Sequence, residues 1–72
     1  MAGGWIYWTV RNTSGRRWTP ESGWKDKAAA ERNAKNLRYE YRRRCVVVPC
    51  RPGALPTDEQ LRRAVAARED AR

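Results

Sequence analysis

The chain has 72 residues, with sixteen Lys and Arg against eight Asp and Glu, two cysteines and no histidine. A chain this short forms one domain that buries only about 60% of its unfolded surface, so its four tryptophans and three tyrosines must supply much of the core. The formal charge of +8 favours acidic partners.

The available side chains argue against catalysis. Without histidine, the thiols of Cys45 and Cys50 and the two serines have no base to activate them, and no pair of carboxylates comes together. Two thiols cannot complete a zinc site, and residues five apart on a strand point to opposite faces, so both cysteines should be reduced. We expect a protein that is not an enzyme, with no catalytic residue, no metal and no cofactor.

The first predicted element is the strand WIYWTVRN, residues 5–12, which alternates apolar side chains on both faces. Trp5 and Tyr7 lie on one face, and Trp8 and Val10 lie on the other, the face that we expect to be core. A strand that is apolar on both faces belongs in the centre of a sheet.

A hairpin should follow this strand. Residues 12–15 are turn formers, residues 16–19 return as a short second strand, and residues 20–24 break the pattern.

Asp26 is a suitable N-cap for a helix that begins at Lys27 and runs into the arginines at 42–44. At helical spacing, one apolar stripe faces the sheet, formed by Ala30, Ala34, Leu37 and Tyr41. A third strand covers residues 45–48, and Pro49 either ends it or marks a sheet edge.

These elements predict an α+β fold: a three-stranded ββαβ sheet with a crossover helix (a split β-α-β unit, first strand in the centre) plus a C-terminal helix. The domain spans residues 1–50, a linker spans 51–56, and a final helix or tail spans 57–72, with Thr57 and Gln60 as a capping box. The sheet face that carries Trp5 and Tyr7 then needs a cover, either the final helix or another molecule.

The positive charge is concentrated in residues 25–44, which hold eight cations and three anions. On the helical wheel, a cationic face with a central tyrosine suits phosphate contacts and stacking, and it comprises Arg32, Lys35, Tyr39, Arg42 and Arg43. The simpler reading is a solvated helix face with a favourable last turn. Arg16 and Arg17 in the hairpin form a second basic spot.

These patterns leave two functional hypotheses. The first is a small basic protein that binds nucleic acid through the cationic helix face and the hairpin arginines. The second is a protein-interaction module that binds an acidic host protein or forms a homodimer through Trp5, Tyr7, Trp18 and the strand edge at Val46 and Val48. No apolar run approaches the ~18 residues of a membrane span, so we expect no membrane partner.

The succession GWIYWTVRN, SGRRW, AAAERNAKNLR and VVVP, within residues 4–50, resembles the small orphan accessory proteins encoded by phages of GC-rich actinobacteria. The resemblance implies an accessory protein that works in the host cytoplasm. The N-terminal sequence MAGGWIYWTV lacks a basic leader, which also predicts a cytoplasmic location.

Overall fold

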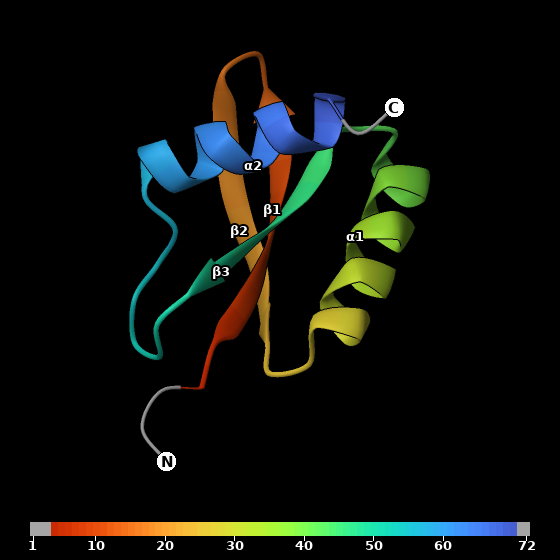
Figure 1. The fold of residues 1–72 in the computed structure, drawn as a ribbon. Helices are drawn as coiled ribbons and strands as arrows, with labels where there is room; N and C mark the ends of the chain where they lie inside the picture. Colours follow the sequence, from red (N-terminus) through yellow and green to blue (C-terminus); the bar gives the residue numbers. More distant parts are fainter. Residues whose placement is uncertain (1–3, 71–72) are drawn as a thin grey trace.

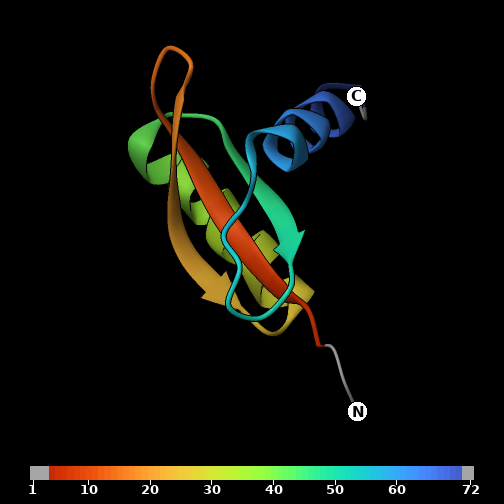
Figure 2. The same ribbon diagram turned by 90° about the vertical axis from the view of Figure 1, so that its left-hand side faces the viewer.

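The computed structural model describes residues 4–70, which form a three-stranded antiparallel sheet with a helix on each face (Figures 1 and 2). The elements in chain order are β1 (Ile6–Ser14), β2 (Arg17–Trp24), α1 (Lys27–Tyr41), β3 (Cys45–Cys50) and α2 (Asp58–Asp70). The strand order β2-β1-β3 puts β1 in the centre, so β2 and β3 run parallel and α1 crosses between them. The predicted α+β class and split β-α-β unit are confirmed. Residues 1–3 and 71–72, at the ends of the predicted segments 1–50 and 57–72, lie outside the described residues.

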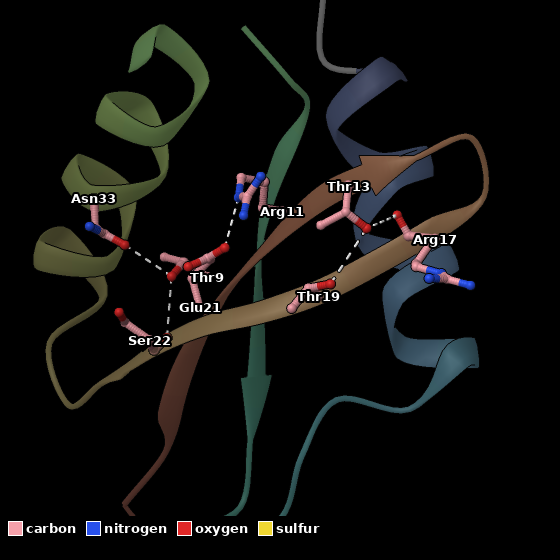
Figure 3. Close-up of polar contacts among 8 residues, drawn as sticks. All are labelled: Thr9, Arg11, Thr13, Arg17, Thr19, Glu21, Ser22 and Asn33. Atoms are coloured by element: carbon pink, nitrogen blue, oxygen red, sulfur yellow. Dashed lines mark hydrogen bonds and ion pairs between the residues drawn. The ribbon is translucent and has the colours of Figure 1, made fainter. Parts of the chain in front are cut away.

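The hairpin is longer than predicted, because β2 continues to Trp24 through the expected break at 20–24. Pro20 is tolerated there because β2 is an edge strand, where a missing N–H costs no ladder bond. The register slips between Thr9 and Val10, so that β2 carries one extra residue, Glu21. Its carboxylate meets Arg11 Nε at 2.7 Å (Figure 3).

Helix α1 begins as predicted, with Asp26 Oδ1 accepting a hydrogen bond from the Ala28 backbone N–H at 3.1 Å. The helix ends earlier than predicted. Arg42 is its C-cap and adopts the left-handed conformation with φ 54°, so residues 42–44 form a connecting loop instead of a last helical turn.

Helix α1 covers the sheet face that carries Thr9, where we had expected the opposite face, that of Trp8. Ala30 and Ala34 are fully buried against the sheet, and Thr9 Oγ1 lies 3.0 Å from Asn33 Oδ1 (Figure 3). The two alanines let the helix approach a face whose central side chain is a small, hydrogen-bonded threonine. Tyr41, predicted in the core, is half exposed, and its ring stacks on Arg11 at 4.2 Å.

Helix α2 covers the other face and completes the main hydrophobic core (Figure 2). The buried residues of this core are Val10, Val46, Val48 and Cys50, and the half-buried residues packed against them are Trp8, Trp18, Leu61, Ala64 and Val65. The predicted capping box is present, since Thr57 Oγ1 accepts from the Gln60 N–H at 3.2 Å and the Thr57 N–H donates to Gln60 Oε1 at 3.0 Å. No helix within residues 4–70 has the length and apolar character needed to cross a membrane.

Both cysteines are free and buried, on opposite faces of β3 as expected. Burial raises the pKa of the Cys45 thiol, although Arg38 acts in the other direction, and burial also raises the pKa of Cys50. The folded state therefore holds both thiol protons more tightly than the unfolded state does.

Replacement of Leu61 by Ala should test whether α2 is part of the cooperative core. Because Leu61 is half-buried, L61A should lower the free energy of unfolding by about 1–2 kcal/mol in urea denaturation, below the ~2–5 kcal/mol typical of fully buried leucines. The exposed neighbour Arg62 supplies the control, and R62A should change stability by less than about 0.5 kcal/mol. Equal effects of the two substitutions would show that α2 does not contribute to the core.

The raised thiol pKa values predict a loss of stability in alkali. Since the unfolded thiols ionise near their ordinary pKa of 9.0 and the folded ones ionise higher, the free energy of unfolding should fall as pH rises above about 9. The double variant C45A/C50A should be less stable at neutral pH but should show a shallower decline between about pH 8 and 10.5. An unchanged decline would assign the effect to other groups.

Candidate nucleic-acid interface

Five arginines line one groove at one end of the molecule, and they come from α1, the loop after it and the last turns of α2. The groove has a volume of about 970 Å³. We call it the arginine groove, and its cationic residues are Arg38, Arg42, Arg43, Arg44 and Arg68. Trp18, Val46 and Val65 supply apolar lining, and Glu31 is the one carboxylate among the described residues that line it.

Arg38 is held in place by the start of β3. Its Nη1 donates to the Cys45 carbonyl oxygen at 2.8 Å, which fixes the guanidinium beside the sheet. Burial lowers the pKa of Arg38, and the nearby positive charge of Arg68 lowers it further. Two guanidinium groups from different helices therefore act on each other electrostatically, and Cys45 and Glu31 offset the lowering of the Arg38 pKa only in part.

The connecting loop is held against β1. The Asn12 N–H donates to the Arg44 carbonyl oxygen at 2.8 Å, which extends the β1–β3 pairing by one residue beyond Cys45. The Arg44 guanidinium lies over the Trp18 ring, 5.5 Å from its centroid. The loop that carries Arg42, Arg43 and Arg44 thus has a defined place between the hairpin and α2.

The hairpin turn brings further positive charge to the same end of the molecule (Figure 1). Asn12 is buried, and its Nδ2 donates to the carbonyl oxygens of Gly15 at 2.8 Å and Arg17 at 3.1 Å. Gly15 takes φ 54°, which glycine adopts without strain. Arg16 and Arg17 are exposed on this turn.

The structure divides the cationic face that the sequence predicted. Arg42 and Arg43 line the arginine groove, whereas three predicted residues stay on the outer surface of α1 and line no part of it: Arg32, Lys35 and Tyr39. Tyr39 is 87% exposed. The helical wheel grouped all five because it extended the helix past Tyr41, where the chain turns.

The side chains of Val46 and Val48 are 4% and 1% exposed beneath α2, so they are not available for a contact with another protein. Their side chains share the sheet face with Val10, which is the face that α2 covers. The predicted contact at this strand therefore has only the backbone edge to use, and it stays a prediction.

The backbone edge of β3 is also partly occupied. Arg38 donates to the Cys45 carbonyl oxygen, and Gln60 Nε2 donates to the Pro49 carbonyl oxygen at 3.5 Å. Pro49 has no N–H to offer. The strand is at the sheet edge as predicted, but it has few groups left to pair with another strand.

The other residues of the predicted protein surface are scattered. Trp5 is 43% exposed, with the Arg51 guanidinium 4.2 Å above its ring. Tyr7 is half-buried on the α1 face, and Trp18 belongs to the arginine groove. These three aromatic residues do not form one surface.

Sequence reasoning missed Arg38, Arg44 and Arg68, although two of them carry a signal. Arg68 follows Leu61 and Val65 at helical spacing, so it continues the apolar stripe of α2 into the groove. Arg38 follows Ala34 by four residues and borders the stripe of α1. In each helix, the arginine that borders the buried stripe is one that lines the groove.

Three of the groove arginines are not neutralised by a carboxylate within the described part of the chain. No described carboxylate forms an ion pair with Arg42, Arg43 or Arg68, whereas ion pairs elsewhere join Arg11 to Glu21 and Arg63 to Glu59. Planar guanidinium groups bind phosphate through paired hydrogen bonds, and several of them together suit an extended polyanion.

Comparison of the chain with protein-family models, with curated proteins and with solved structures finds no match in any of the three.

A multivalent anion should stabilise the protein through the groove. At a sulfate concentration about five times its Kd, binding adds about 1 kcal/mol and raises Tm by about 4–8 °C over chloride at equal ionic strength. Because sulfate also stabilises proteins by exclusion from their surfaces, the increment must be compared between variants.

Two double variants of equal net charge make that comparison. The groove variant, R43E/R68E, should lose most of the sulfate increment, and the surface variant, R32E/R62E, should keep it. Equal increments in both would show that sulfate does not bind in the groove.

Proposed function

We propose that this protein is a non-enzymatic nucleic-acid-binding protein that holds a phosphate backbone in the arginine groove. The observation that supports this most strongly is the convergence of five arginines on one concave surface lined by a single described carboxylate. Backbone phosphates dominate the affinity of nucleic acids for proteins, and arginine is well suited to bind them.

The arrangement of the site favours a polymer over a single small anion. The arginines come from α1, from the loop after it and from α2. The hairpin turn, which carries Arg16 and Arg17, lies at the same end of the molecule (Figure 1). Positive charges from several separate segments can contact successive phosphates along a strand. Trp18 adds an aromatic surface among them, as is common where bases or sugars pack.

An alternative function, binding to a host protein, has weaker support. Trp5 is exposed beside Arg51, and tryptophan with arginine is a frequent composition of interaction hot spots. That pair offers only a small contact surface, because the other residues predicted for protein interaction are buried, half-buried or part of the groove. A nucleic-acid-binding role also suits an accessory protein in a phage-infected cytoplasm, which is where we propose it acts.

The test is binding of fluorescently labelled oligonucleotides, measured by anisotropy at about 50 and 200 mM salt. The wild type should bind, and its affinity should fall steeply with salt as phosphate contacts release counterions. In the groove variant, R43E/R68E, the loss of two charge-assisted contacts at ~1.5–3 kcal/mol each should weaken binding by roughly 100-fold or more.

The surface variant, R32E/R62E, is the matched control, since it has the same net charge and should bind within a few-fold of wild type. A loss confined to the surface variant would move the site to the outer surface of α1. Absence of wild-type binding at low salt would refute a nucleic-acid function.

A further inference from the structure

A cavity of about 240 Å³ lies between α1 and α2, over the edge of β3. Val47, Pro49 and Ala64 give it apolar walls, and Tyr7 and Lys27 bring polar groups to it. The two helices do not pack on each other within the described residues, which leaves this space beside the strand edge.

The cavity adjoins the arginine groove. The two share half of the residues that line the cavity, namely Glu31, Arg38, Val46, Ala67 and Arg68. Arg38 and Arg68 therefore border both spaces, so a phosphate between them would be next to the cavity.

We propose that the protein binds single-stranded nucleic acid and that one unpaired base enters this cavity while its phosphate is held by Arg38 and Arg68. This inference rests on the proposed function and specifies its ligand. The cavity is smaller than the ~300–1,000 Å³ sites that hold drug-sized ligands, which suits one flat ring system and not a whole nucleotide.

The chemistry of the walls matches a base. Val47, Pro49 and Ala64 can contact the faces of an aromatic ring, while Glu31 and Lys27 bring an acceptor and a donor for its polar edge. In a duplex each base is paired and stacked, so its insertion would cost unpairing and unstacking free energy. A single strand does not incur the unpairing cost, and hence should be preferred.

An abasic strand separates base recognition from phosphate binding, because it keeps the phosphates and lacks the bases. We would measure wild-type affinity for a labelled mixed-sequence strand of about 12 nucleotides, for its abasic counterpart and for the matched duplex. The normal strand should bind about tenfold more tightly than the abasic strand, as expected for loss of base stacking, and more tightly than the duplex.

A cavity-filling substitution tests the location. Ala64 lines the cavity and not the groove, so A64L should lower affinity for the normal strand toward the abasic level and leave abasic affinity unchanged. The control, A66L, places the same side chain at an exposed position on the same helix and should leave both affinities unchanged. Thermal unfolding followed by circular dichroism verifies that each variant folds. If A64L does not fold, the comparison of wild-type affinities for the normal and abasic strands still tests the proposal.

The outcomes distinguish the two proposals. Equal wild-type affinity for normal and abasic strands, or a preference for duplex, would overturn base insertion, and the groove function would survive if R43E/R68E still weakened binding as predicted above. Polyglutamate that displaced the strand at equal charge concentration would also overturn base insertion, in favour of an acidic protein ligand. No binding to any oligonucleotide at about 50 mM salt would overturn both proposals.

Discussion

Asn12 connects the parts of the molecule on which the candidate site depends. Its backbone N–H donates to the carbonyl oxygen of Arg44, and its buried side-chain amide donates to the carbonyl oxygens of Gly15 and Arg17. One residue of the central strand therefore holds both the hairpin turn and the loop after α1. Leaving such an amide unpaired in the interior would cost about 1–3 kcal/mol. This cost favours the backbone conformation that keeps its carbonyl partners in place. The arginines of the turn and of the loop gather at one end of the molecule because these two segments are attached to the same residue.

The two faces of the sheet meet different requirements. The face toward α2 is the apolar core of Val10, Val46 and Val48, whereas the face toward α1 has a hydrogen-bonded threonine at its centre and two alanines above it. So small a sheet cannot supply two large hydrophobic cores, and a close-packed alanine helix over Thr9 is the compact alternative. Within the described residues, α1 and α2 cover opposite faces and do not pack on each other, and the space between them at the β3 edge is where groove and cavity adjoin.

Local patterns were sufficient to predict the topology but not the site. The alternation in β1, the Asp26 cap and the Thr57–Gln60 capping box all act within a few residues, and each was predictable from the sequence. The face assignment of α1 was not, because Ala30 and Ala34 fit either face, and contacts such as Thr9–Asn33 join residues 24 apart in the sequence. The groove likewise joins Arg38 to Arg68, which only the packing of α2 brings together. Arg42 and Arg43 were predicted with the wrong neighbours, since the helix that was expected to continue through them ends at Tyr41.

The left-handed backbone of Arg42 shows that two demands compete at one position. A helix C-cap with φ 54° is a place where glycine has no steric penalty, and a side chain there costs on the order of 1 kcal/mol. The chain has an arginine at this point, and its side chain lines the groove. Termination of the helix and placement of charge cannot both be optimal here. Under the proposed function, conformational stability at this residue is given up for a charge that contacts the ligand.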